Sequence, residues 1–268
     1  MLASCCILSI GITGNLYNFF GGNMVKIRNI RKNYAKSTTY AVDGLSLDLN
    51  GGEIFGFLGP NGAGKTTTIK MITGILPFEE GEITVCGYDV VKESLLAKKE
   101  IGYVTDSGVL FEKLTGREFV DFMADVYDVG EERKERAEKL LSAFNLTSAF
   151  DNRIETYSHG MKQKIAIIGA LVHNPKVLVL DEPMVGLDPQ SAKELKDIMR
   201  AHADAGNVVF FSTHVLDTAE KICDRIGIII KGKLVMTGTL DEIRSAKGDG
   251  SLEDIFIAVA SENDKAEV

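Results

Sequence analysis

The sequence predicts an α/β fold built on a parallel sheet, and three observations support this prediction. Short apolar runs at residues 53–58, 177–180 and 208–211 are typical of buried strands and alternate with segments of helical spacing. The first run leads through a glycine-rich loop into a predicted helix at residues 65–76. Charged residues and alanines at helical spacing predict an inserted helical unit at about residues 108–160.

The other elements follow from local patterns. Alternation of apolar and polar residues indicates half-buried strands near the start of the chain. The other predicted elements are strands at residues 25–28, 41–49, 83–85, 226–230 and 233–236, and helices at residues 159–172 and 189–203. The last two strands form a hairpin around Lys231 and Gly232. The polar tail after Ala260 is expected to be frayed.

Charge and cysteine content narrow the class of protein. The 268 residues include 30 lysines and arginines and 38 aspartates and glutamates, which gives a net charge of −8. Because nucleic acids are bound by basic surfaces, this balance argues against nucleic acid as a partner. The four cysteines, two of them adjacent, predict reduced thiols and not a disulfide framework.

The first 23 residues differ in composition from the rest of the chain. They carry no charge, but glycines and asparagines interrupt them, so they do not predict a transmembrane helix. They also lack the basic start of a signal peptide. We expect this segment to lie outside the fold, with regular patterning from Met24 onwards. An apolar arm that touches a membrane is the alternative.

The glycine-rich loop matches the eight-residue pattern of a phosphate-binding loop. Its residues are Gly59, Pro60, Asn61, Gly62, Ala63, Gly64, Lys65 and Thr66. The glycines allow backbone N–H groups to converge on phosphate oxygens at the positive end of the following helix. Lys65 would reach the β- and γ-phosphates, and the Thr66 hydroxyl would be a ligand of Mg2+. Thr67 would lie near the α-phosphate.

A second candidate group follows the apolar run at residues 177–180, where the chain continues with Asp181 and Glu182. Ligands of an open α/β sheet gather at the carboxyl ends of its strands. Asp181 is predicted to hold Mg2+ through water. Because adjacent strand residues face opposite ways, Glu182 must have a different role, and it is the better candidate to polarise an attacking water.

Together with these residues, further motifs over residues 25–238 resemble the ATP-binding cassette (ABC) ATPases, in the family's order. Ser158-His159-Gly160-Met161-Lys162-Gln163 resembles the signature, Gly186-Leu187-Asp188-Pro189 the D-loop, and Ser212-Thr213-His214 the switch-histidine segment. Tyr34 stands where the family places the aromatic ring that stacks on adenine. Taken singly, Ser158 and Asp188 are helix caps, His214 is a polar residue at a strand end, and Tyr34 is a core residue.

The resemblance implies an α/β fold with a P-loop NTPase core, an antiparallel β subdomain and an inserted α-helical subdomain. It divides the chain into an N-terminal extension at residues 1–23, an ABC ATPase domain at residues 24–240 and a C-terminal extension at residues 241–268. The implied cofactors are ATP and Mg2+. The implied catalytic residues are Lys65, Glu182 and His214.

The resemblance also implies partners. In this family the signature of one copy faces the phosphate loop of another, so Ser158 and Gly160 would complete the ATP site of a second ATP-binding subunit. That subunit is either an identical copy or a different chain. A separate membrane (permease) subunit would provide the transport path. The implied location is cytoplasmic, peripheral on the inner face of the cell membrane.

Two positions depart from the family's pattern. Asp106 replaces the usual glutamine after the strand at residues 101–104, and it would still offer an oxygen ligand to Mg2+ while adding charge beside the phosphates. His159 and Met161 replace the commoner glycine and glutamine, a form that resembles the branch serving exporters of drugs, ions or polysaccharides. The predicted function is ATP hydrolysis that powers a transporter, with export favoured.

Two other functions stay open at this point. A soluble ABC ATPase that drives assembly or regulation without transport would carry the same motifs. Co-purification with an integral membrane protein distinguishes it from a transporter subunit. A phosphate-loop kinase or GTPase would need a pocket for a phosphoryl acceptor, and it gives no role to Ser158, Gly160 or His214.

Overall fold

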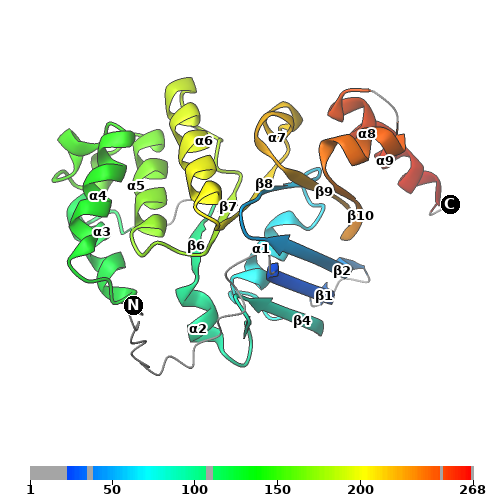
Figure 1. The fold of residues 1–268 in the computed structure, drawn as a ribbon, viewed down its shortest axis with the longest axis horizontal. Helices are drawn as coiled ribbons and strands as arrows, with labels where there is room; N and C mark the ends of the chain where they lie inside the picture. Colours follow the sequence, from blue (N-terminus) through cyan, green and yellow to red (C-terminus); the bar gives the residue numbers. More distant parts are fainter. Residues whose placement is uncertain (1–22, 35–38, 107–110, 248–249, 267–268) are drawn as a thin grey trace, which may run out of the picture.

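Two β-sheets form the centre of the molecule (Figure 1). The computed structural model describes residues 23–34, 39–106, 111–247 and 250–266. Of the N-terminal segment expected outside the fold, residues 1–22 lie outside the described residues, and Asn23 begins the first strand.

The larger sheet has six strands in the order β10-β9-β3-β8-β7-β6. They are β3 (Ile54–Leu58), β6 (Ile101–Val104), β7 (Val177–Asp181), β8 (Val208–Thr213), β9 (Arg225–Ile230) and β10 (Lys233–Gly238). Neighbouring strands are parallel except for β9 and β10, which form the expected hairpin. All residues of β3, β7 and β8 are buried, because this sheet is covered on both faces.

The smaller sheet is antiparallel and has the order β2-β1-β4-β5. Its strands are β1 (Asn23–Asn33), β2 (Tyr40–Asn50), β4 (Glu80–Val85) and β5 (Tyr88–Asp89). The turn between β9 and β10 connects it to the larger sheet, since the Asp43 backbone N–H donates to the Gly232 carbonyl at 2.9 Å. The antiparallel β subdomain implied by the resemblance is therefore present.

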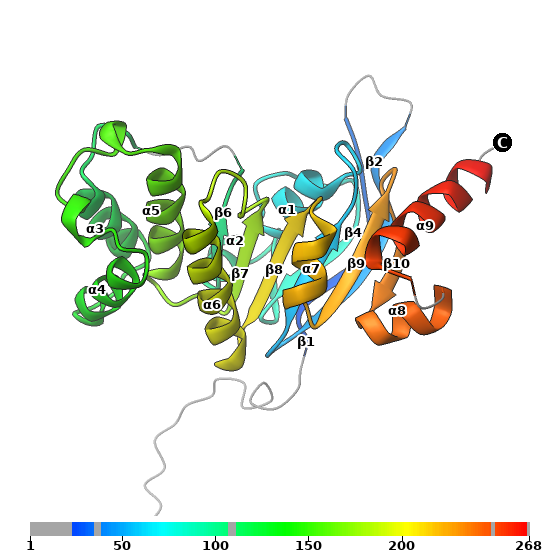
Figure 2. The ribbon, with the colours of Figure 1, turned by 90° about the horizontal axis from the view of Figure 1, so that it is seen from above.

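Helix α1 (Lys65–Ile72) packs between the two sheets (Figure 2). Its apolar side chains share a core with both sheets, so burial fixes its orientation and with it the start of the helix. The predicted end at residue 76 is wrong. The helix ends at Ile72 because Gly74 takes a left-handed backbone conformation, with φ of 65°.

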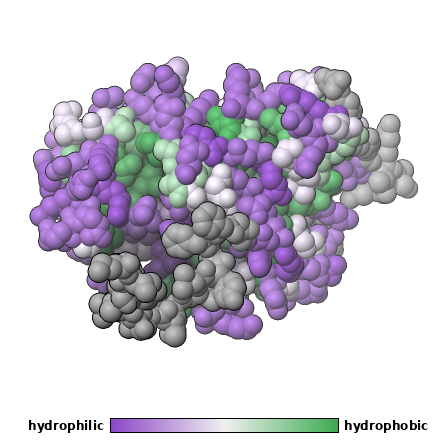
Figure 3. Space-filling view, in the orientation of Figure 1, coloured by the Kyte–Doolittle hydropathy of each residue, from purple (hydrophilic) through white to green (hydrophobic). Residues whose placement is uncertain are grey.

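The inserted unit contains α3 (Gly116–Val126), α4 (Glu132–Ala143) and, at its end, the start of α5 (His159–Leu171). The capping box of Thr115 and Glu118 begins α3. The helical stretch is interrupted before α4, where Asp128 has a positive φ. The apolar core of the inserted unit is continuous with that of the larger sheet, because it includes Leu178 and Leu180 of β7. Most of the face seen in Figure 3 is hydrophilic, with smaller hydrophobic areas over this helical group.

Four helices follow β7 along the chain, and the short α2 (Ser94–Lys99) precedes β6. The four are α6 (Pro189–Asp204), α7 (Leu216–Ile222), α8 (Leu240–Lys247) and α9 (Leu252–Ala266). The expectation of a frayed tail after Ala260 is wrong, because α9 continues to Ala266. Before Ala260, the helix buries Leu252, Ile255 and Val259 in a core with β9. In the described residues, no helix has the length and hydropathy needed to cross a membrane.

Candidate active site

The carboxyl ends of β3, β7 and β8 lie together at one edge of the larger sheet. Leu58 at the end of β3 is paired with Thr213 of β8, and Asp181 at the end of β7 is paired with Ser212. The phosphate loop follows Leu58, Glu182 follows Asp181, and His214 follows Thr213. The sheet therefore brings together three segments that are far apart in the sequence.

The backbone of the phosphate loop depends on its glycines. Gly62 and Gly64 have φ values of 80° and 108°, which side chains resist. A Cβ atom at Gly64 would lie 2.5 Å from the Ala41 carbonyl oxygen, and one at Gly59 would lie 2.5 Å from that of Ile229. The Thr68 backbone N–H donates to the Gly64 carbonyl at 2.9 Å and continues the loop into α1. The loop is thus closely held by its surroundings, with the N–H groups at the start of α1 facing this edge.

The Lys65 side chain is buried and turns back over the loop. Its Nζ donates to the Gly59 carbonyl at 2.7 Å and lies 3.4 Å from Oε1 of Glu182. Only 6% of Lys65 is exposed, so its charge is balanced mainly by these oxygens.

The Asp181 carboxylate is held by one oxygen and free at the other. Ser212 Oγ donates to Oδ1 at 2.5 Å, while Oδ2 is buried and has no hydrogen-bond partner among the described residues. Only 1% of Asp181 is exposed, and an unpaired carboxylate oxygen is costly at such a depth. A hard cation is the chemical partner that such an oxygen fits, and the Thr66 hydroxyl at the start of α1 is a second donor of the same type.

The side chains of Asp181 and Glu182 point in different directions, but strand alternation, which the sequence suggested, is not the reason. The strand ends at Asp181, and Glu182 takes a left-handed conformation with φ of 48°. Its backbone N–H donates to Ser212 Oγ at 3.0 Å, and its Oε2 lies 3.0 Å from Nδ1 of His214. Ser212 therefore holds the carboxylate of Asp181 and the backbone of Glu182. This double contact depends on β8 lying beside β7, which the sequence does not reveal.

A pocket of about 370 Å³ lies over the phosphate loop and brings most of the predicted site residues together. Its lining consists of Tyr34, Ala41, Pro60, Asn61, Gly62, Gly64, Lys65, Thr66, Thr67, Asp106 and Glu182. The interpretation of Tyr34 as a core residue is wrong, since 46% of it is exposed and its hydroxyl lies 3.2 Å from Thr67 Oγ1. Tyr34 is instead available at the rim of the pocket.

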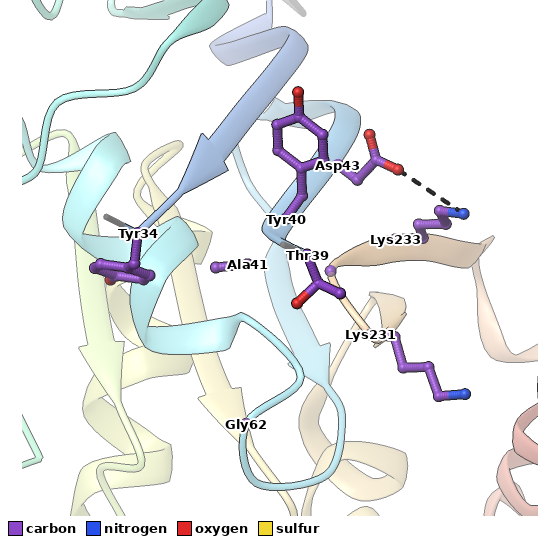
Figure 4. Close-up of a pocket in the computed structure, with 9 residues that line it drawn as sticks. Tyr34, Thr39, Tyr40, Ala41, Asp43, Gly62, Lys231 and Lys233 are labelled. Atoms are coloured by element: carbon purple, nitrogen blue, oxygen red, sulfur yellow. Dashed lines mark ion pairs between the residues drawn. The ribbon is translucent and has the colours of Figure 1, made fainter. Parts of the chain in front are cut away.

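A second pocket of about 540 Å³ adjoins the first and shares Tyr34, Ala41 and Gly62 with it. Figure 4 shows that Lys231 and Lys233, on either side of Gly232, form its other side. Lys233 Nζ lies 3.8 Å from a carboxylate oxygen of Asp43. The two pockets together form a continuous site that begins at the phosphate loop.

The C-terminal helix also reaches the phosphate loop. Ala260 of α9 and the loop residues at 60–63 line a smaller pocket of about 220 Å³, together with Ile230 and Lys231. The loop is thus bordered on this side by the last described helix of the chain.

Ser158 and Gly160 line none of these three pockets. Ser158 is the N-cap of α5, and its Oγ accepts a hydrogen bond from the Met161 backbone N–H at 3.3 Å. Gly160 faces the Gly186 carbonyl oxygen, so the signature-like segment packs against the D-loop-like segment. Asp188 caps α6 by accepting from the Ser191 backbone N–H at 3.0 Å, as expected.

Comparisons with known proteins agree on one family. The family model described as "ABC transporter" matches residues 42–185. The linearmycin resistance ATP-binding protein LnrL of Bacillus subtilis (strain 168) is 40% identical over 240 residues, which are 89% of this chain and 76% of the relative. This chain belongs to the ABC transporter family. The daunorubicin/doxorubicin resistance ATP-binding protein DrrA of Streptomyces peucetius is also 40% identical, over 80% of this chain and 65% of the relative.

Solved structures of ABC proteins have the same fold. An ATP-binding subunit of an ABC transporter matches with a TM-score of 0.84 and 30% identity, over 88% of this chain and 99% of the other. The ATP-binding cassette MJ0796, in a dimeric post-hydrolysis state bound to ADP and Pi, matches with a TM-score of 0.74 and 26% identity, over 81% and 99% of the two chains. The chain is therefore an ATP-binding subunit of an ABC transporter and hydrolyses ATP to ADP and phosphate. ABC cassettes dimerise and pair with a membrane permease.

Proposed function

We propose that this ABC subunit powers the export of a drug-like or antibiotic compound through a separate permease. The printed names of its relatives support this proposal, since LnrL and DrrA are resistance proteins and YbhF of Escherichia coli (strain K12), 33% identical, is a probable multidrug transporter protein. The His159 and Met161 form of the signature points the same way. The subunit would work at the inner face of the cell membrane as a peripheral cytoplasmic protein.

We propose that the triphosphate of ATP occupies the smaller of the two adjoining pockets and that the nucleoside extends past Tyr34. The backbone N–H groups of the phosphate loop bind the phosphate oxygens, and Lys65 moves its charge from the Gly59 carbonyl to the β- and γ-phosphates. The exposed ring of Tyr34 stacks on the adenine, and Thr67, in contact with Tyr34, lies near the α-phosphate.

The Mg2+ that accompanies ATP would be held by the Thr66 hydroxyl and by Asp181, whose Oδ2 needs a partner. Asp106 lines the same pocket and would contribute a third oxygen. When bound, the ion neutralises charge on the phosphates. Ser212 fixes the Asp181 carboxylate so that Oδ2 points away from the hydroxyl that holds Oδ1.

The observation that carries the catalytic proposal is the position of Glu182 between Lys65 and His214. Once Lys65 turns to phosphate, one oxygen of Glu182 is free to accept a hydrogen bond from the attacking water, while His214 orients the other oxygen. His214, half-exposed at this edge, also approaches the γ-phosphate. Glu182 is thus the general base or water-orienting residue, and Lys65 and His214 stabilise charge.

We propose that a second ATP-binding subunit, identical or different, completes the site with Ser158 and Gly160. These residues begin a helix of 13 residues, whose first N–H groups and positive dipole suit a γ-phosphate across an interface. In the described part of the chain, they line neither of the two pockets beside the phosphate loop, which supports a role in the site of a partner.

The test is to purify the chain from solubilised membranes and to identify the proteins that accompany it. We expect an integral membrane protein, and phosphate release from ATP that needs no acceptor substrate and increases when the permease is present. A chain that is recovered only with cytosolic proteins would favour assembly or regulation without transport. Phosphate transfer to an added acceptor would favour a kinase.

A further inference from the structure

Tyr103 of β6 lies on the same face of the larger sheet as Asp181. It is paired with Val179 of β7, and Asp181 is two residues further along β7 on the same side. Two residues of strand correspond to about 6.6 Å, a distance that a tyrosine leaning along its strand can cover. The core that Tyr103 packs against also contains α1, so this is the face on which Thr66 begins its helix.

The Tyr103 hydroxyl is buried and has no hydrogen-bond partner among the described residues. Burial and then the charges of Asp181 and Asp106 raise the pKa of Tyr103, so the phenol keeps its proton at neutral pH. One unpartnered donor therefore lies near one unpartnered acceptor, Oδ2 of Asp181, and near the carboxylate of Asp106. No role in the proposed hydrolysis accounts for this hydroxyl.

We propose that Tyr103 is a positioning residue of the metal site. When the metal is bound, its hydroxyl would donate a hydrogen bond to Oδ2 of Asp181, directly or through one water. It thereby orients Oδ2 of Asp181, while Ser212 holds Oδ1. This inference rests on the proposed metal site.

The test is the Mg2+ dependence of thermal unfolding for the full chain with saturating ATP, with and without EDTA. Outer partners of metal ligands affect metal affinity by about 10- to 100-fold, so we expect Tyr103→Phe to raise the Mg2+ concentration for half-maximal stabilisation by about tenfold or more. Without nucleotide, its Tm should not fall, because the hydroxyl loses no protein partner. Tyr88→Phe, a tyrosine that packs against the same core, is the matched control and should leave both values unchanged.

A second measurement uses the wild-type chain alone. It has seven tyrosines and no tryptophan, so its ultraviolet difference spectrum reports tyrosine directly. Mg2+ added to the ATP-loaded chain should perturb a tyrosine signal that is missing in Tyr103→Phe.

The outcomes separate the two proposals. If Mg2+ does not stabilise the ATP-loaded wild type, the metal site itself is wrong, and this inference with it. If Mg2+ stabilises the wild type and Tyr103→Phe equally, at the same half-maximal concentration, the metal site stands and the role of Tyr103 is wrong. A wild type whose tyrosine spectrum does not respond to Mg2+ also overturns the role of Tyr103, whether or not the variant folds.

Discussion

Nδ1 of His214 lies 3.0 Å from Oε2 of Glu182, and this contact joins the ends of two neighbouring strands. The other oxygen of Glu182 lies 3.4 Å from Nζ of Lys65. The carboxylate is therefore fixed from two sides before any phosphate enters. When Lys65 moves to the phosphates, the contact with His214 remains and keeps the carboxylate oriented.

Glu182→Gln should keep ATP binding and lose hydrolysis, since the amide retains the shape of the carboxylate but is a poor proton acceptor. A positioned base contributes about 10²- to 10⁴-fold, so phosphate release should fall within that range. Gel filtration with ATP should show a long-lived dimer. Glu138→Gln, on the exposed side of α4, is the control. Near-normal phosphate release by Glu182→Gln would rule out this role.

Lys65→Ala should weaken both ATP binding and turnover, because the loop loses the cation that meets the phosphates. A hydrogen bond to a charged group contributes about 1.5–3 kcal/mol, which corresponds to roughly 10- to 150-fold in Kd. Titration calorimetry with ATP measures the effect. Lys70→Ala, in the last turn of the same helix, should change the Kd little. Equal affinities of wild type and Lys65→Ala would count against the phosphate-loop assignment.

Tyr34→Ala should weaken ATP binding while Tyr34→Phe should not. Stacking of a base on an aromatic ring is worth about 1–3 kcal/mol, or roughly 5- to 150-fold in affinity, and phenylalanine retains it. The same titrations with inorganic triphosphate should show no difference between the variants. If Tyr34→Phe is as weak as Tyr34→Ala, the hydroxyl contact with Thr67 matters and not the ring.

Gly64→Ala should destabilise the phosphate loop more than a left-handed backbone alone explains. Its Cβ would meet the Ala41 carbonyl, whereas at Gly206, with φ of 87°, a Cβ would meet nothing within 4 Å. In urea unfolding, Gly206→Ala should therefore lower the free energy of unfolding by only about 1 kcal/mol. Gly64→Ala should lower it by more and should also abolish ATP binding. Similar losses for the two variants would show that the approach to Ala41 is unimportant.

Stability should fall between pH 7 and pH 5. Burial lowers the pKa values of His173 and His202 to about 4, whereas both titrate near 6.5 in the unfolded chain. As pH falls, the unfolded state takes up protons before the folded state does. The two neutral histidines therefore leave the free energy of unfolding intact above about pH 6.5, and their protonation lowers it towards pH 4. At pH 5 each histidine lowers the free energy of unfolding by about 2 kcal/mol relative to pH 7. His202→Gln should show a smaller loss between these pH values in urea unfolding, and an unchanged loss would contradict this assignment.

The sequence predicted the strands and loops around the site well because their signals are local. Apolar runs such as the one before Asp181 and the glycines of the phosphate loop determine their own conformation. The order of strands in the sheet depends on packing between distant segments. For this reason the contacts of Ser212 with the Asp181 carboxylate and the Glu182 backbone, and the proximity of Tyr103 to Asp181, could not be read from the sequence.

The missed helix α9 is a different case. Leu252, Ile255 and Val259 recur at helical spacing, so the pattern was present, but the polar residues after Ala260 obscured it. For Tyr34, the local pattern pointed to the wrong environment. An aromatic residue after an alternating strand has the composition of a core residue, and only the course of the chain at the end of β1 leaves it exposed.

The pocket that Ala260 shares with residues 60–63 has a practical consequence for work on this protein. A label or fused domain joined to α9 near Ala260 lies beside the phosphate loop, so we expect it to change the rates of ATP binding and hydrolysis. Tags for assays belong elsewhere on the surface, and we expect a fluorophore near Ala260 to report nucleotide binding.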